Sequence, residues 1–278
     1  MSGLRIRPRC RVVVDNDWAG DPDGLVALAH HLLSPANRVE AVTSSQLNPV
    51  FGPPAGTAAA GARLARELVA LVGGPQPVVA AGCDVPIGDG DTTSAAADAI
   101  VAEARRDDPL PLFVVCGGPL TNVAQALRQA PEVAGRFTLV WVGGALDPAA
   151  PEYNRDTDPR AAAEVFGVPE LAVDQFPLET YRRCTSSVAE LEADLGGAGA
   201  VGAWLWQRFL ELPIPDFVQL GEVWPLGDSP PVLVTALDDA SSTSTGEPRR
   251  RVFTDVDHRL LVADLLAKLR LHGRRTAG

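Results

Sequence analysis

An apolar stretch that ends in a group of aspartates is the feature of this sequence that most constrains its fold. The β-branched run at residues 12–14 predicts a buried strand, and residues 25–33 carry apolar side chains at helical spacing. The loop between them holds four carboxylates within nine residues: Asp15, Asp17, Asp21 and Asp23. In an open α/β sheet, ligands bind beyond the carboxyl ends of the strands, so we expect a site at this loop.

Carboxylates at this density raise one another's pKa unless a cation lies among them. Ligands that offer only oxygen favour a hard cation, Ca²⁺ or Mg²⁺, over zinc. The alternative is an ordinary turn, because Asp, Gly and Pro are common turn residues and an Asp before a helix often caps it. A turn needs no such charge, so the pattern favours a cation site.

The chain as a whole has the composition of a globular protein. Its 278 residues suffice for one large domain, and we expect residues 1–278 to form a single α/β domain. A hydrophobic content of 46% with mean hydropathy +0.07 excludes general disorder. A formal net charge of −11 argues against nucleic acid or an anionic membrane as partner.

Targeting and cysteine patterns favour the cytoplasm. Residues 1–11 contain four arginines but lack the apolar core of a secretion signal, and no window reaches the roughly 18 apolar residues of a membrane span. The four cysteines are far apart, which argues against a zinc site built on sulfur and predicts reduced thiols.

Apolar strands alternate with amphipathic helices along the rest of the chain. This alternation predicts a mostly parallel, doubly wound sheet flanked by helices. Strands are expected at 39–43, 77–81, 112–116, 137–142, 171–174 and 252–257, and helices at 57–71, 95–105, 123–127, 159–166, 188–195, 201–212 and 259–271. Residues 232–237 fit a helix or a strand, residues 241–250 read as an exposed, mobile connection, and His30 and His31 are expected at the surface end of the first helix.

The acidic loop resembles the opening motif of the nucleoside hydrolases. In that family the motif reads Asp-x-Asp-Pro-Gly-x-Asp-Asp and holds a Ca²⁺ in the active site; here it reads Asp15-Asn16-Asp17 followed by Gly20-Asp21. Three further segments match in the family's order: Gly118-Pro119-Leu120-Thr121-Asn122, Gly143-Gly144 with Glu152-Tyr153-Asn154 and Asp158-Pro159, and Gly227-Asp228 before an apolar helix.

The resemblance implies roles for residues in these segments. The Thr121 carbonyl and the Asp228 carboxylate would complete the Ca²⁺ shell, although residues 117–122 alone are also an ordinary turn and Asp228 also fits a helix N-cap ahead of Pro230. Glu152 and Asn154 would bind ribose hydroxyls; two residues apart in an extended segment, they point the same way, though a solvated loop carries such residues too.

The segment that corresponds to the family's second ribose-binding asparagine is ambiguous. Asn48 is our prediction, with Gln46 as the alternative.

The sequence departs from the family pattern at two places. The adjacent Asp pair is here Asp21-Pro22-Asp23, so either Asp23 turns in as a ligand, which we favour, or the site has one ligand fewer. Gly227 stands where many members have a His that protonates the departing base. The substitutes are a stacking Trp, an acid, or a substrate with a better leaving group; the residues considered are Trp224, Trp204, Trp206, Asp216 and Glu222.

The resemblance therefore predicts Ca²⁺-dependent hydrolysis of the N-glycosidic bond of a ribonucleoside or related ribosyl compound, giving ribose and free base. Asp17, Asp23, Asp228 and the Thr121 carbonyl would hold the ion, Asp17 would also be the general base, Asp21 would hold the 2′-hydroxyl, and Trp224 would contact the base.

Two rivals remain open: a catalytically degenerate nucleoside- or ribose-binding protein, and a hydrolase of a modified nucleoside in specialised metabolism. A phosphohydrolase is disfavoured because the motifs supply no basic group. The family's habit also allows a homodimer or homotetramer.

Overall fold

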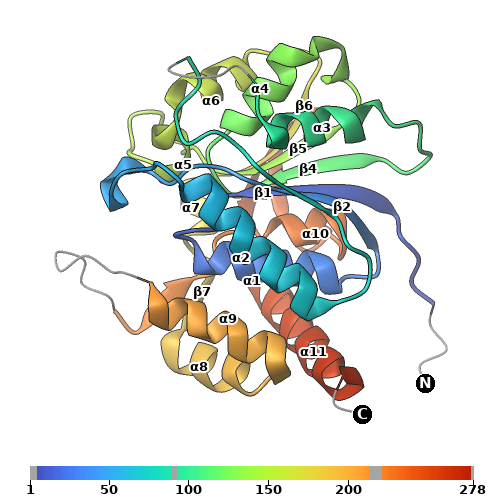
Figure 1. Ribbon diagram of the computed structural model, residues 1–278, viewed down its shortest axis with the longest axis vertical. Helices are drawn as coiled ribbons and strands as arrows, with labels where there is room; N and C mark the ends of the chain where they lie inside the picture. The colour runs from blue at the N-terminus through green and yellow to red at the C-terminus, as the bar shows by residue number, and fades with distance from the viewer. Residues whose placement is uncertain (1–4, 89–92, 213–220, 277–278) are drawn as a thin grey trace.

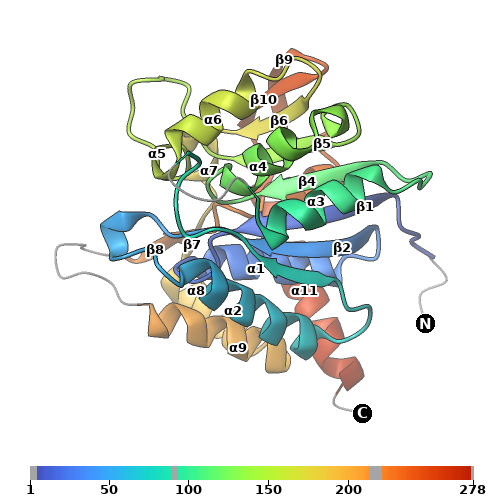
Figure 2. The same ribbon diagram turned by 45° about the horizontal axis from the view of Figure 1, so that its top comes forward.

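The computed structural model describes residues 5–88, 93–212 and 221–276 (Figures 1 and 2). In this part of the chain an eight-stranded sheet has the order β3-β2-β1-β4-β5-β6-β10-β9, and every neighbouring pair is parallel except β10 with β9. The strands are β1 (Cys10–Asn16), β2 (Asn37–Ser44), β3 (Val78–Ala81), β4 (Leu112–Cys116), β5 (Thr138–Val142), β6 (Ala172–Phe176), β9 (Thr243–Glu247) and β10 (Arg250–Asp255). A separate antiparallel pair joins β7 (Thr185–Ser187) to β8 (Val223–Pro225).

The strand order reverses between β1 and β4. Strands β2 and β3 extend from one side of β1, and β4, β5 and β6 extend from the other. Loops that leave β1 and β4 therefore diverge at this point, and the divergence opens a crevice at the carboxyl edge of the sheet. The acidic loop follows β1 and the loop at residues 117–120 follows β4, so both flank that crevice.

Helices cover both faces of the sheet (Figure 2). One face carries α3 (Ala95–Arg105), α4 (Thr121–Gln129) and α6 (Pro159–Phe166), with Ile100, Leu120 and Leu139 buried beneath them. The other carries α1 (Pro22–Leu33), α2 (Thr57–Val72), α8 (Val188–Gly196), α9 (Gly199–Glu211) and α11 (His258–Thr276), over a second core that includes Leu28 and Leu68. The short helices are α5 (Tyr153–Thr157), α7 (Leu178–Tyr181), α10 (Pro231–Thr235), η1 (Pro49–Phe51) and η2 (Pro131–Val133).

The α/β class and the mostly parallel sheet predicted from the sequence are confirmed, and the expected strands and long helices all form. The segment left open at residues 232–237 is helical, as α10. Residues 241–250 contain a strand that was not predicted: β9 pairs antiparallel with β10 there, and its side chains are exposed, as expected. Its Ser/Thr-rich sequence lacks the apolar alternation of a half-buried strand, which is why it read as a loop.

The expected surface position of His30 and His31 is also wrong. Both residues have zero exposed area, because α11 packs over this end of α1 and brings the Asp264 Oδ2 to 2.7 Å from the His30 Nε2. Burial lowers the pKa of both imidazoles, that of His31 to about 3. A local helix pattern carries no information about a helix more than 200 residues later.

The amino edge of the sheet is closed by an ion-pair network. Arg11, 4% exposed at the start of β1, contacts Glu103 at 2.5 Å, and Arg106 contacts Glu40 at 2.5 Å. Arg38 pairs with both Glu40 and Asp108. Among the described helices, none combines the length and apolar character that a bilayer crossing requires.

Candidate functional site

A cavity of about 400 Å³ opens at the carboxyl edge of the sheet, where β1 and β4 diverge. Its wall combines acidic and aromatic side chains. We call Asp17, Asp21, Asp23 and Asp228 the acidic wall, and Phe51, Tyr153, Tyr181 and Trp224 the aromatic wall. Its volume falls in the range of small-molecule sites.

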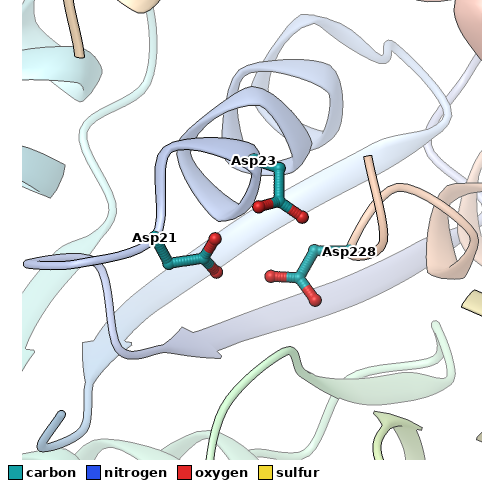
Figure 3. A group of neighbouring side chains, drawn as sticks. All are labelled: Asp21, Asp23 and Asp228. Carbon is teal, nitrogen blue, oxygen red and sulfur yellow. The ribbon is translucent and has the colours of Figure 1, made fainter. Parts of the chain in front are cut away.

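Three carboxylates of the wall converge on one point (Figure 3). One oxygen each from Asp21, Asp23 and Asp228 lies within 4.8 Å of the others. Pro22 begins α1, which makes Asp21 the N-cap residue and places Asp23 in the first turn. The Asp21 side chain makes no capping hydrogen bond, so it is available to the cluster. The amino end of α1 also favours negative charge through its exposed N–H groups and its dipole.

Asp228 reaches this cluster from the far end of the chain. Its Oδ2 accepts a hydrogen bond of 2.6 Å from the Asn16 side chain, which ties it to the end of β1. A Cβ on Gly117 would lie 2.5 Å from Asn16 Nδ2 and 2.7 Å from Asp228 Oδ2, so this contact requires glycine after β4. The alternative of Asp228 as a helix cap is wrong, because Pro230 is the N-cap residue of α10.

Asp17 lines the same cavity but stands beside the three converging carboxylates. It is 2% exposed, and its Oδ2 accepts a hydrogen bond of 3.1 Å from the Tyr153 hydroxyl. Burial raises the pKa of Asp17 to about 7, against the lowering effect of the Tyr153 contact. A carboxyl group that titrates near neutrality can accept a proton from water.

The cluster lacks compensating charge. Burial, together with Asp228, raises the pKa of Asp21 well above its usual range, and burial, together with Asp21, does the same for Asp23. Burial also raises the pKa of Asp228 to about 8. In the described part of the chain, no Lys, Arg or His lines the cavity. Three converging oxygen donors without a cationic side chain fit a hard divalent cation.

Asp15 belongs to the protein interior. It is fully buried and accepts hydrogen bonds from Thr43 at 2.5 Å and Asn122 at 2.7 Å, with the Cys116 thiol at 3.5 Å. These contacts join β1 to β2, β4 and the start of α4. Asp15 thus fixes the base of the acidic loop rather than lining the cavity.

Glu152 and Asn154 are both buried, and only Asn154 lines the cavity. The Glu152 carboxylate caps α5 and accepts four hydrogen bonds: from the backbone N–H groups of Gly144, Asn154 and Arg155, and from the Tyr181 hydroxyl. Asn154 donates to two backbone carbonyls, while its buried Oδ1 has no partner in the structure. Asn154 therefore offers an acceptor to a ligand, and the Glu152 oxygens are already occupied.

The remaining predicted ligands do not line the cavity. Asn48 caps η1 and donates through its side chain to Thr157, and its backbone N–H contacts the Tyr153 hydroxyl. Thr121 is the first residue of α4, with its hydroxyl donating to Asp158 and accepting from Gln46. Their roles toward a ligand stay predictions.

Of the described residues considered as substitutes for the missing histidine at position 227, Trp224 lines the cavity. Its Nε1 lies 3.4 Å from the Asp23 carboxylate. The alternatives Trp204, Trp206 and Glu222 are not in the wall, and Asp216 lies outside the described residues. Asp23 also accepts a hydrogen bond of 3.0 Å from the Gly227 N–H. The two positions at which the sequence departs from the family pattern are therefore in direct contact.

Four residues that the site description names were missed from the sequence: Asn16, Phe51, Tyr153 and Tyr181. Asn16 and Tyr153 stand inside the motifs that were recognised, so their positions were an available signal. Phe51 and Tyr181 lie in none of the matched motifs, and only the fold brings them to the cavity.

Comparison with known proteins gives matches to the sequence and to the fold. The family described as inosine-uridine preferring nucleoside hydrolase matches residues 12–259. An uncharacterised protein of Schizosaccharomyces pombe is 37% identical over 123 residues, and the pyrimidine-specific ribonucleoside hydrolase RihA of Salmonella arizonae is 32% identical over 120 residues. Each match covers 40% of this chain and 38% of the relative.

Among solved structures, the inosine-guanosine nucleoside hydrolase IG-NH superposes with a TM-score of 0.72, at 16% identity, over 94% of this chain and 98% of that one. That likeness establishes the fold. Since the family match spans most of the sequence, the chain belongs to the inosine-uridine preferring nucleoside hydrolase family.

Proposed function

We propose that this protein hydrolyses the N-glycosidic bond of a ribonucleoside or related ribosyl compound, with Ca²⁺ as cofactor, and releases ribose and the free base. The observation that carries the proposal is the convergence of Asp21, Asp23 and Asp228 beside Asp17 in one cavity of about 400 Å³. Family membership supports the reaction class, and the all-oxygen donor set supports Ca²⁺ over zinc.

Asp21, Asp23 and Asp228 would hold the cation, with Asp17 beside them as a further ligand. When bound, the cation would polarise a water and a sugar diol and lower their pKa. Asp23 would take the place of the second aspartate of the family's adjacent pair. Pro22 begins α1, and the carboxylates of Asp21 and Asp23 on either side of it both belong to the converging group. A Thr121 carbonyl ligand rests on the family resemblance.

Asp17 would take the proton of the attacking water. Its position in the cavity beside the converging carboxylates and its Tyr153 hydrogen bond suit a positioned base. Asp21 and Asn154 would contact sugar hydroxyls, Asn154 through its unpartnered Oδ1. Roles for Asn48 and Glu152 at the sugar rest on the resemblance alone.

The acidic wall also suits the transition state. Cleavage of an N-glycosidic bond builds positive charge on the sugar, and fixed carboxylates stabilise that charge more than the neutral substrate. The base would lie against the aromatic wall, with Trp224 as its stacking partner.

The test is to incubate the protein with a panel of purine, pyrimidine and modified nucleosides plus Ca²⁺ and to measure released reducing sugar. We expect release that chelation abolishes and that Asp17→Ala reduces more than 100-fold, because loss of a base costs about 10²–10⁴-fold. Asp98→Ala, which changes an exposed aspartate of α3, is the matched control and should retain full activity.

Two outcomes would replace the proposal. Nucleoside binding without sugar release would indicate a degenerate binding protein, for which the glycine at position 227 is the structural reason. Release from a modified nucleoside alone would indicate an enzyme of specialised metabolism.

Wider predictions accompany the proposed function. We propose a single-domain cytoplasmic enzyme of purine or pyrimidine metabolism that acts on a small molecule. Assembly as a homodimer or homotetramer follows the family habit and is testable by light scattering.

A further inference from the structure

The cavity wall beside Gly227 contains the phenol of Tyr181, which lies outside the four segments matched to the family. A Cβ built on Gly227 would lie 3.1 Å from Cδ2 and 3.8 Å from Cε2 of Tyr181. The Tyr181 ring therefore stands in the space that a side chain at position 227 would enter. Tyr181 lines the same cavity as the carboxylate cluster.

Tyr181 is held on a short but well-anchored element. It is the last residue of α7. The N–H of Leu178, the first residue of that helix, donates a hydrogen bond of 2.8 Å to the Gly144 carbonyl. The neighbouring Thr180 hydroxyl donates 2.6 Å to the Phe253 carbonyl in β10. These contacts fix α7 to the ends of two strands, so the ring position is set by the sheet.

The Tyr181 hydroxyl donates 2.8 Å to Glu152 Oε1. Glu152 also accepts three backbone N–H groups, so its buried carboxylate keeps partners when the phenol hydrogen turns away. The other side-chain donors in the described cavity wall are Tyr153, Trp224 and Asn154. Tyr153 donates to Asp17, Trp224 to Asp23, and Asn154 to two backbone carbonyls. The Tyr181 contact is shorter than those of Tyr153 and Trp224, but its acceptor keeps three backbone N–H partners when the phenol turns away.

We propose that Tyr181 donates a hydrogen bond to the departing base, from the space that glycine at position 227 leaves open. The inference rests on the proposed function, since cleavage of the N-glycosidic bond leaves the bonding electron pair on the base. The phenol stabilises that charge and keeps its own proton. Burial, reinforced by Glu152, raises the pKa of Tyr181, which keeps the phenol neutral throughout the reaction.

The test compares two substrates in the Tyr181→Phe protein: an ordinary nucleoside, and a nitrophenyl riboside whose leaving group is stable as an anion. We expect kcat for the nucleoside to fall about 100-fold, as for other lost transition-state hydrogen bonds, with little change in KM. The nitrophenyl riboside should be cleaved at nearly the wild-type rate. An equal loss on both substrates, or no loss on the nucleoside, would overturn the assignment.

Two variants separate this role from structural effects. Tyr153→Phe alters the other tyrosine of the chain and removes its hydrogen bond to the proposed general base, Asp17. It should therefore change the rates of cleavage of both substrates by the same factor. Thr180→Val weakens the anchoring of α7 without touching the cavity, and should leave the ratio of the two rates unchanged. A Thr180→Val protein with the Tyr181→Phe pattern would assign the effect to helix position and overturn the proposal.

Failure of the proposed function gives a different result. A wild-type protein that cleaves neither substrate with Ca²⁺ present overturns the hydrolase assignment and this inference with it. A wild-type protein that cleaves both, with a Tyr181→Phe protein indistinguishable from it, overturns this inference alone.

Discussion

The two ends of β1 differ in how their clustered carboxylates are compensated. At the amino end, three arginines meet three carboxylates: Arg11, Arg38 and Arg106 with Glu40, Glu103 and Asp108. At the carboxyl end, four carboxylates share a cavity whose described wall contains no cationic side chain. The two groups lie at opposite ends of one strand, and among the described residues cationic side chains accompany the carboxylates only at the amino end.

The pKa values show what the difference does. The Leu110 N–H and the Arg38 guanidinium hold the pKa of Asp108 below its usual range, whereas burial raises the pKa of Asp228 to about 8. The paired end is stable in its charged form. The unpaired end is stable in its charged form only when a cation joins it, which is the property expected of a binding site.

The largest expected effect is the loss of activity when a carboxylate is removed from the unpaired cluster at the carboxyl end of β1. Asp228→Ala removes one of the three converging carboxylates and should lower activity more than 100-fold, because even residues that only support a metal ligand typically cost about 10–100-fold. It should also abolish the rise in melting temperature that Ca²⁺ gives by binding the folded state. Thermal melts with and without Ca²⁺ measure this, and an unchanged Ca²⁺-dependent rise would show that Asp228 is not a ligand.

Breaking the paired end should change stability and leave the cation response intact. Arg11→Ala leaves the Glu103 carboxylate without one of its two arginine partners, and we expect the free energy of unfolding to fall by about 3 kcal/mol. Urea denaturation measures the loss.

Arg105→Ala is the matched control, since its pair with Glu132 is exposed and should contribute little to the free energy of unfolding. If the two variants lose equal stability, burial of the network is not what makes it matter.

The contrast also explains how far the sequence predicted this molecule. Strands and long helices were predictable because their apolar periodicity is local: α3 and β4 have the bounds expected at 95–105 and 112–116. Exposed β9 lacks that signal, and its pairing with β10 supplies the strand. Burial of His30 depends on Asp264, which no local pattern connects to it.

For the candidate site, motifs predicted the residues of the acidic wall and the fold decided their arrangement. Asp17, Asp21, Asp23 and Asp228 do share one cavity. Asp21, expected at a sugar hydroxyl, stands in the converging trio, while Glu152 is occupied as the cap of α5. Which oxygen atoms stay unoccupied depends on neighbours such as Gly144 and Tyr181, and spacing in the sequence does not encode this.

The smallest expected effect is on the free energy of unfolding, when one carboxylate at each end of β1 is replaced by the corresponding amide. In metal-free protein, Asp21→Asn removes a buried carboxyl group whose charged form is disfavoured by burial and by Asp228, and it should raise the free energy of unfolding at pH 8. The sign follows from raised pKa values: the unfolded carboxyls ionise near pH 4 and those of folded Asp17 and Asp228 near pH 7 to 8. Wild-type stability is therefore lost as pH rises through that interval, and the gain from Asp21→Asn should vanish near pH 4.

Glu40→Gln should have the opposite sign. Burial raises the pKa of Glu40, but hydrogen bonds from Arg106 and Arg38 outweigh this and lower it, so its charge stabilises the fold above pH 4 to 5 and the stabilisation is lost in acid. The amide should therefore lower stability at pH 8. Urea titrations of both variants at pH 4 and pH 8, with a chelator present, measure the two signs. Equal signs at pH 8 would mean that the carboxylates around Asp21 are compensated by groups other than a cation.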